Sequence, residues 1–123
     1  MKILLVEDNV LNQKVVVFHL KKYAFEVVCV VNWREAMEEF KNNTPDLILM
    51  DIMLPEKNGF EITAEIREYE KSIEKNEGVP IIALTANTLD NDKNKCLRAG
   101  MNDYLPKPFS AEELYEAIKQ FIP

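Results

Sequence analysis

The chain has 123 residues, a length that fits one domain with one hydrophobic core. Its hydrophobic fraction of 47% and charged fraction of 29% exclude a disordered chain. The net charge of −6, without a cluster of Lys and Arg, argues against direct binding to nucleic acid or to an anionic membrane. No apolar stretch approaches the roughly twenty residues that cross a bilayer, and the first residues resemble a strand rather than a signal peptide. We therefore expect one cytoplasmic domain over residues 1–123.

Five short apolar runs alternate with longer segments of helical periodicity. The predicted strands are Ile3–Val6, Val27–Val31, Leu47–Met50, Ile81–Leu84 and Asp103–Leu105. Such alternation is typical of βαβ units around a parallel sheet. Because the strands are apolar throughout, we expect helices to cover both faces of the sheet. The predicted fold is a doubly wound α/β three-layer sandwich, with a helix after each strand.

The first predicted helix begins near Asn9 and ends around Tyr23. Apolar residues recur in it at i, i+4 and i+7, and we expect this stripe to face the core: Leu11, Val15 and Phe18. His19 lies in the same helix, and we expect it at the surface or an edge rather than in a phosphoryl-donor role.

A second helix is predicted from about Trp33 to Lys41, and a third after Asn58-Gly59. The expected inward positions are Ala36, Met37 and Phe40 in the second helix, and Ile62, Ile66 and Tyr69 in the third. Four glutamates of the third helix are expected to form a solvated acidic face: Glu61, Glu65, Glu68 and Glu70.

The fourth predicted helix runs from Leu89 to Arg98 and is closed by Gly100. Its first half is rich in weak helix formers, so we expect that half to move or fray. The last helix has a clear start, because Ser110 and Glu113 have the spacing of a capping box. Its expected core residues are Leu114, Ile118 and Phe121.

Reactive side chains come at the ends of four of the apolar runs. Glu7 and Asp8 follow the first run, Asp51 the third, Thr85 the fourth and Lys107 the fifth. The carboxyl ends of parallel strands share one edge of a sheet, where open α/β sheets bind ligands. Acids gathered at one edge repel each other unless a cation lies among them, and Mg²⁺ prefers carboxylate and carbonyl oxygens. The sequence therefore predicts a magnesium site at this edge.

Asp51 has the best position for chemistry at this edge. An aspartate beside a bound cation can attack phosphorus and form an acyl phosphate. Thr85 would then supply a hydroxyl donor and Lys107 an ammonium donor to the oxygens of the attached phosphoryl group.

Four segments, in this order and at these separations, are similar to the receiver domain of two-component response regulators, of the chemotaxis-regulator type. The matching segments are Ile3–Asn9, Met50–Pro55 with Gly59, Ile82–Ala86 and Gly100–Phe109. The stretch Val6–Gln13 further resembles the receivers of hybrid histidine kinases, including a Glu-Asp pair where many members have two aspartates. The resemblance covers essentially the whole chain, and it implies a flavodoxin-like sheet in the order 2-1-3-4-5.

The resemblance also implies the roles of the site residues. Asp51 would accept a phosphoryl group from a histidine on a sensor histidine kinase or a histidine phosphotransfer protein. Asp8, Asp51 and the backbone carbonyl of Met53 would bind Mg²⁺, with Mn²⁺ as a substitute, and Glu7 would bind it through water. A cis peptide bond is implied between Lys107 and Pro108.

A switch is implied as well: Thr85 turns towards the phosphoryl group and Tyr104 swings inward. This would reshape the face of the fourth helix, fifth strand and fifth helix, where a downstream effector or a second copy could bind. The domain would be regulatory rather than metabolic, although it would promote its own phosphotransfer and slow dephosphorylation. The chain ends after the fifth helix, so we expect it to signal by docking or to be part of a longer protein.

Met53 and Asn87 each lie two residues beyond a predicted site residue, so we expect them to flank the path of the hydrolytic water. We hypothesise that Met53 shields the phosphoryl group while Asn87 orients water weakly, which makes self-dephosphorylation slow. Decay of the acyl phosphate in Met53→Asn, compared with the parent, measures this effect. Faster decay is expected, and decay that is unchanged or slower would count against shielding.

Two alternative functions share this fold. A flavodoxin-like cofactor binder would need a glycine- and hydroxyl-rich phosphate loop after the first strand, where this chain has Glu7, Asp8 and Asn9. An interaction domain that works without phosphorylation would not need Asp8, Asp51, Thr85 and Lys107 together.

Overall fold

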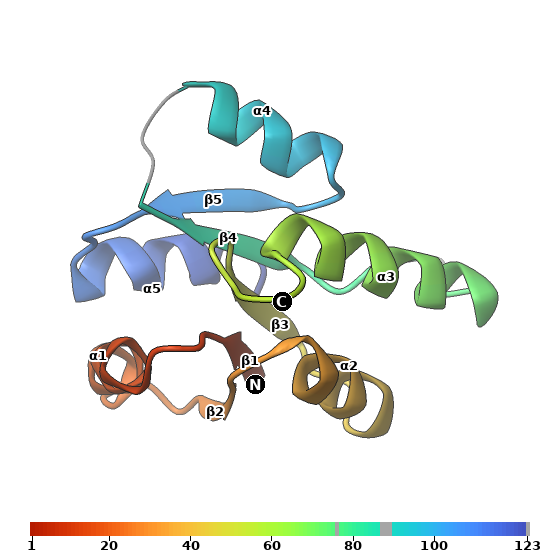
Figure 1. The fold of residues 1–123 in the computed structure, drawn as a ribbon. Coiled ribbons are helices and arrows are strands. Elements are labelled where there is room, and N and C mark those ends of the chain that lie inside the picture. The colour runs from red at the N-terminus through yellow and green to blue at the C-terminus, as the bar shows by residue number, and fades with distance from the viewer. Residues whose placement is uncertain (76, 87–89, 123) are drawn as a thin grey trace.

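A five-stranded parallel sheet forms the centre of the protein in a computed structural model that describes residues 1–75, 77–86 and 90–122 (Figure 1). The strands are β1 (Lys2–Val6), β2 (Glu26–Val30), β3 (Leu47–Asp51), β4 (Ile81–Thr85) and β5 (Asp103–Pro106). The sheet order is β2-β1-β3-β4-β5, and all four neighbouring pairs are parallel. The predicted strands and their order 2-1-3-4-5 are confirmed.

Helices cover both faces of this sheet. They are α1 (Val10–Leu20), α2 (Trp33–Asn42), α3 (Gly59–Ser72), α4 (Asp90–Arg98) and α5 (Ala111–Lys119). In Figure 1, α1 and α5 lie on one side of the sheet, and α2 and α3 on the other, with α4 beside β5. Side chains of β1 alternate between the two faces: Leu4 and Val6 pack in the core that contains residues of α2, α3 and α4, and Ile3 and Leu5 in the core with α1 and α5. The three-layer prediction is confirmed.

The predicted inner face of α1 is wrong. Leu11 and Phe18 are 70% and 74% exposed, and Val15 is 44% exposed. The helix instead buries Val16 and Leu20. The reason lies in its composition, because apolar residues occupy almost every side of α1 and their spacing selects no single face.

The acidic face predicted for α3 holds only in part. Glu61 and Glu68 are exposed, but Glu70 is 3% exposed. A buried carboxylate needs charged or hydrogen-bonding partners. Glu70 has both, since it pairs with Arg67 and accepts a hydrogen bond from the backbone of Val79.

The other helix predictions agree with the structure. α2 buries Ala36, Met37 and Phe40 as expected, and Ser110 and Glu113 form the capping box of α5. Gly100 follows α4 with a φ of 102°, a conformation that favours glycine. Leu89, the predicted first residue of the fourth helix, lies outside the described residues, and α4 is described from Asp90.

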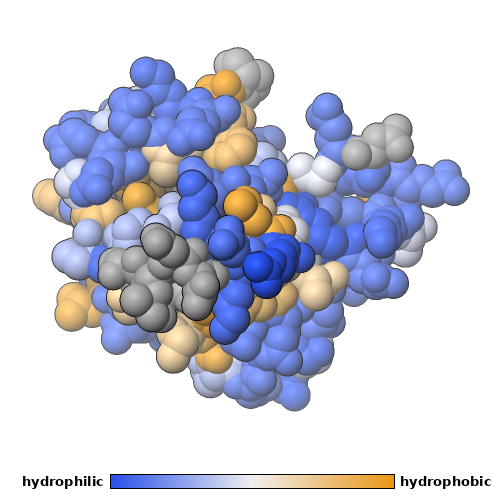
Figure 2. Space-filling view, turned by 90° about the horizontal axis from the view of Figure 1, so that it is seen from above, coloured by the Kyte–Doolittle hydropathy of each residue, from blue (hydrophilic) through white to orange (hydrophobic). Residues whose placement is uncertain are grey.

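The surface seen from above is mostly hydrophilic, with apolar side chains in small separate patches (Figure 2). Cys29 and Cys96 are both free thiols. Among the helices of the described ranges, none combines the length and apolar character needed to cross a membrane.

Candidate functional site

Three carboxylates meet at the carboxyl edge of the sheet. Glu7 and Asp8 directly follow β1, and Asp51 is the last residue of the neighbouring β3. One oxygen from each of the three lies within 4.8 Å of the other two. Glu7 and Asp51 are 1% and 5% exposed, whereas Asp8 is open to solvent. The predicted acidic cluster is therefore present, with two buried members and one at its mouth.

In the described part of the chain, one ammonium group, that of Lys107, forms ion pairs with these acids. The Nζ atom of Lys107 lies 3.2 Å from Oε1 of Glu7 and 3.7 Å from Oδ1 of Asp51. Lys107 follows β5, and its backbone N–H donates to the carbonyl of Thr85 at 2.6 Å. The Lys107–Pro108 bond is cis, as expected. The end of β5 is therefore held against the end of β4, and this places the ammonium over the acids.

Backbone and amide donors orient the buried acids. The N–H of Met53 donates to Oδ1 of Asp51 at 3.1 Å, and the N–H of Asn9 to Oε2 of Glu7 at 3.2 Å. Gln13 donates from Nε2 to the carbonyl of Glu7 at 2.7 Å. Sequence reasoning assigned no role to Gln13. One feature of the sequence could have indicated it: Gln13 lies near the start of a helix that begins just after the strand end. This position brings its amide back over Glu7.

The environment of Asp8 fits a metal ligand. Asp8 is exposed, but the loss of some water around its carboxyl is the main cause that raises its pKa above the ordinary value of 3.8, and the adjacent Glu7 carboxyl raises it further. Lys107 acts in the opposite direction, with a smaller effect. A divalent cation would favour the charged form of all three acids, and carboxylate oxygens are ligands that Mg²⁺ prefers. The chemistry of the donor set therefore fits magnesium.

Gly59 fixes the corner that carries Asp51. Its N–H donates to the carbonyl of Ile52 at 3.0 Å. A Cβ atom at Gly59 would lie 2.6 Å from the backbone oxygen of Asp51 and 3.0 Å from the Cα of Ile52. Neither backbone atom can move away cheaply, so α3 can start this close to the end of β3 only with glycine there.

Three of the remaining predicted residues, Thr85, Tyr104 and Met53, lie in the described part of the chain. Thr85 is 4% exposed at the end of β4 and lines a cavity of about 480 Å³ together with Met53 and Lys95. Tyr104 is half-buried in β5 and packs against the core on the α3 side of the sheet. Met53 is 75% exposed. Asn87, the other residue expected to tune dephosphorylation, lies outside the described residues.

An exposed apolar surface on α1 borders the site. It consists of Val10, Leu11, Val15, Val17 and Phe18, which we call the α1 apolar face. A cavity of about 360 Å³ joins this face to the acids, because Val15 lines it together with Glu7, Lys107 and Phe109. His19 is half-buried, and its ring lies 6.3 Å from the rings of both Phe18 and Phe109.

Sequence relatives of this chain are histidine kinases. Hybrid signal transduction histidine kinase B of Dictyostelium discoideum is 45% identical over 98% of the chain. Histidine kinase 2 of Arabidopsis thaliana is 35% identical, also over 98% of the chain. The chain spans 7% and 12% of the lengths of these two proteins.

Solved structures of similar chains are receiver domains. The receiver domain of a sensor histidine kinase from Pseudomonas aeruginosa, with a magnesium ion coordinated in its active-site cleft, is 43% identical with a TM-score of 0.84; the match covers 98% of this chain and 95% of that one. A receiver domain of a Saccharomyces cerevisiae response regulator, crystallised with its histidine phosphotransfer protein, is 35% identical with a TM-score of 0.91. That match covers 98% of this chain and 88% of the other.

The family assignment rests on sequence and fold together. The profile of the response regulator receiver domain matches residues 3–119. The sheet order β2-β1-β3-β4-β5 and the cluster of acids at the carboxyl edge agree with this match. The chain therefore belongs to the response regulator receiver domain family.

Proposed function

We propose that this receiver domain accepts a phosphoryl group on Asp51 from a phosphohistidine donor, and that residues 1–123 act as one such domain. The observation that carries the proposal is the convergence of the Glu7, Asp8 and Asp51 oxygens within 4.8 Å, next to the Lys107 ammonium. A cation, an acid nucleophile and an acidic metal-binding cluster are the groups that phosphoryl transfer to a carboxylate requires. The role is regulatory signalling.

The transfer exchanges one bond to phosphorus for another. A carboxylate oxygen of Asp51 attacks the phosphorus, an O–P bond forms, and the P–N bond to the donor histidine breaks. The imidazole nitrogen keeps the electron pair of that bond, and the ring leaves neutral when its other nitrogen carries a proton. The Met53 N–H holds the Asp51 carboxylate, while Lys107 and Thr85 supply donors to the phosphoryl oxygens.

The metal would be held by Asp8, Asp51 and the carbonyl of Met53, and Mn²⁺ would serve in place of Mg²⁺. Glu7 would contact it through water, because both Glu7 oxygens already accept hydrogen bonds, from Lys107 and from the Asn9 N–H. When bound, the ion offsets the negative charge that accumulates as two anions approach each other.

The phosphohistidine donor docks over the α1 apolar face. Exposed apolar side chains next to a charged site are typical of a protein-binding surface. The complex of a related receiver with a histidine phosphotransfer protein supports a partner of this kind. A donor helix seated there would bring its histidine to the cavity shared by Val15 and Lys107.

Phe18→Ala tests this docking surface. We expect transfer from a phosphohistidine-carrying phosphotransfer protein to slow about tenfold, because Phe18 is the most exposed large residue of the face. Phosphorylation by acetyl phosphate, which needs no docking, is expected to stay unchanged. Ile73→Ala is the matched control, since Ile73 is 53% exposed just beyond α3. Equal transfer rates in both variants would exclude the α1 apolar face as the docking surface.

The output is a change in the face formed by α4, β5 and α5. Two observations support a switch role for Thr85 and Tyr104: they lie on the adjacent strands β4 and β5, and Thr85 is buried while Tyr104 is half-buried. An effector protein or a second copy of the chain would bind the altered face. Hydrogen exchange before and after phosphorylation reports the change, and an identical exchange pattern would contradict it.

The proposed function is tested by intact-mass measurement after incubation with acetyl phosphate, with Mg²⁺ and with EDTA. A gain of one phosphoryl group is expected with Mg²⁺ alone. Hydroxylamine should remove it, because it cleaves acyl phosphates. If Mg²⁺ gives no gain, the better account is an interaction domain that keeps the receiver fold and works without phosphorylation.

A further inference from the structure

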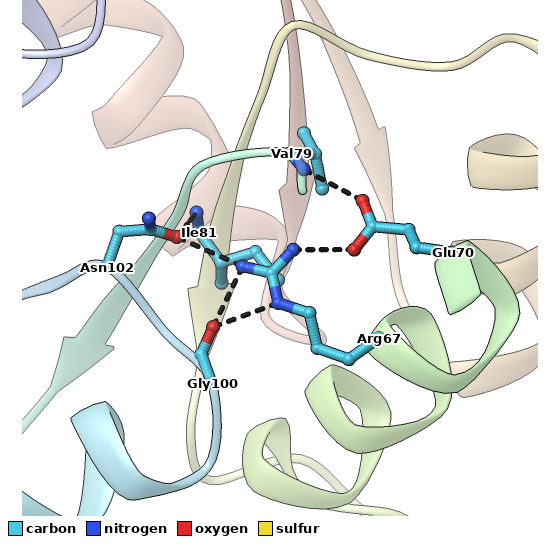
Figure 3. A network of polar contacts seen from close by, with 6 residues as sticks. All are labelled: Arg67, Glu70, Val79, Ile81, Gly100 and Asn102. Atoms are coloured by element: carbon cyan, nitrogen blue, oxygen red, sulfur yellow. Dashed lines mark hydrogen bonds and ion pairs between the residues drawn. The ribbon is translucent and has the colours of Figure 1, made fainter. Parts of the chain in front are cut away.

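Arg67 of α3 lies at the centre of a polar network that includes Glu70, Gly100 and Asn102 (Figure 3). Its Nε and Nη2 atoms donate to the carbonyl of Gly100 at 2.9 and 2.8 Å, and Nη2 also donates to Oδ1 of Asn102 at 3.0 Å. Its Nη1 atom pairs with Oε1 of Glu70 at 2.8 Å. All three guanidinium nitrogens therefore have partners.

Two of the three partners of Arg67, Glu70 and Asn102, are also bonded to the start of β4 or to the segment before it. Oε2 of Glu70 accepts the Val79 N–H at 2.8 Å. Asn102 pairs with Ile81 twice: its Oδ1 accepts the Ile81 N–H at 2.9 Å, and its own N–H donates to the Ile81 carbonyl at 2.8 Å. The network thus connects α3, the start of β4 and the segment between α4 and β5.

The Arg67 side chain lies against two glycines, Gly78 and Gly100. A Cβ atom at Gly78 would lie 2.6 Å from Nη1 of Arg67 and 3.0 Å from Oε1 of Glu70. Gly100 has a φ of 102°, and a Cβ atom there would lie 3.2 Å from Cγ of Arg67. The backbone on both sides therefore leaves room for the guanidinium group and little else.

The carbonyl that Arg67 holds lies directly after α4. Hydrogen bonds continue from the helix into this turn, from the N–H of Ala99 to Lys95, of Gly100 to Leu97 and of Met101 to Cys96. The C-terminal end of α4 is consequently tied to α3 at a point far from Asp51. Thr85 lies at the other end of β4, next to the site.

We propose that Arg67 is a positioning residue with two effects. It holds the C-terminal end of α4 in place, which we call the anchor, and it makes Gly100 the fixed point about which α4 moves on phosphorylation, which we call the pivot. The response to phosphorylation rests on the proposed function, whereas the anchor itself does not. With this end held by two bonds to one carbonyl, the movement transmitted from the site is confined to the rest of α4 and the adjoining surface. The α4–β5–α5 face then changes its orientation while the C-terminal end of α4 stays bound to α3.

Arg67→Lys removes the hydrogen bonds to Gly100 and Asn102 but keeps a positive charge beside the buried Glu70 carboxylate. A lysine ammonium keeps a cation for Glu70, but it lacks the planar fork that reaches Gly100 and Asn102 together. Arg34→Lys is the matched control, because it makes the same chemical change at an exposed position of α2. Gly78→Ala is a second perturbation, since its methyl group would displace the guanidinium without altering Arg67.

Amide hydrogen exchange on the unphosphorylated proteins tests the anchor. In Arg67→Lys and Gly78→Ala, we expect the amides of Ala99, Gly100 and Met101 to lose at least about tenfold in protection relative to those of β1, which report global opening. Normalising to β1 removes any general loss of stability. If the protection ratio in both variants equals that of Arg34→Lys, Arg67 does not anchor α4.

The same measurement after acetyl phosphate and Mg²⁺ tests the pivot. In the parent, phosphorylation should change exchange in the α4–β5–α5 face while the three anchor amides stay constant. In Arg67→Lys the change should spread to those amides, which a purely structural role would not produce. Equal responses in parent and variant overturn the pivot. A parent that gains no phosphoryl group contradicts the proposed function and removes the pivot with it, while the unphosphorylated comparison still decides the anchor.

Discussion

Asp51→Asn is expected to abolish the magnesium-dependent gain of a phosphoryl group, as measured by intact mass. An amide has no anionic oxygen to attack phosphorus, so no acyl phosphate can form. The fold should persist, because the amide oxygen can still accept the Met53 N–H that now binds Oδ1 of Asp51. Without metal, we expect the variant to be as stable as the parent or more so, because the cluster then holds two carboxylates instead of three and their mutual repulsion is smaller, while Lys107 keeps its ion pair with Glu7.

Asp103→Asn is the control for this variant. Asp103 begins β5 at the opposite edge of the sheet, and its carboxylate accepts a hydrogen bond that an amide oxygen can also accept. The control should gain the phosphoryl group at the parental rate. A gain that survives in Asp51→Asn would place the phosphoryl group on another residue and contradict the assignment of Asp51.

Lys107→Met is expected to slow phosphorylation by acetyl phosphate about a hundredfold. The loss of one positioned donor to a developing anion commonly has an effect of this size. The substitution also leaves the Glu7 carboxylate, 1% exposed, without the cation that lies 3.2 Å away. We expect the free energy of unfolding in EDTA to fall by about 2 kcal/mol, and part of this loss to be recovered in Mg²⁺.

Lys57→Met provides the comparison for both effects. Lys57 also forms an ion pair, with Glu65 at 2.8 Å, but both side chains are more than a third exposed. Exposed pairs contribute little, so its unfolding free energy should change by less than about 1 kcal/mol. Initial rates from mass spectra and urea unfolding curves give the two quantities. Equal rates for Lys107→Met and Lys57→Met would show that the ammonium has no role in the transfer.

The candidate site was predictable because its residues are placed by the strands alone. In a parallel sheet, every carboxyl end lies at one edge, so residues that follow apolar runs must be neighbours once the order is known. Glu7, Asp51 and Lys107 met this expectation. Gln13 was missed because its contact depends on the angle at which α1 leaves the strand, and residue spacing does not record that angle.

The orientation of α1 shows where residue spacing failed. Leu11 and Phe18 have the spacing of a core stripe, but so do Val16 and Leu20, and the structure buries the second pair. Hydrophobic periodicity selects a face only when the opposite face is polar. In α2 the opposite face is charged, and the prediction was correct.

By itself, the sequence of this protein determined the order of strands and helices, the burial of both sheet faces and the edge where the reactive groups meet. These follow from short runs that are apolar throughout, from helical patterns of period 3.6 and from the geometry common to parallel sheets. The tertiary structure alone decided which face of α1 is exposed, and why Glu70 is buried. The partners of Glu70 and Arg67 come from segments separated in the chain, at Val79 and Gly100, and only folding brings these groups within hydrogen-bonding distance.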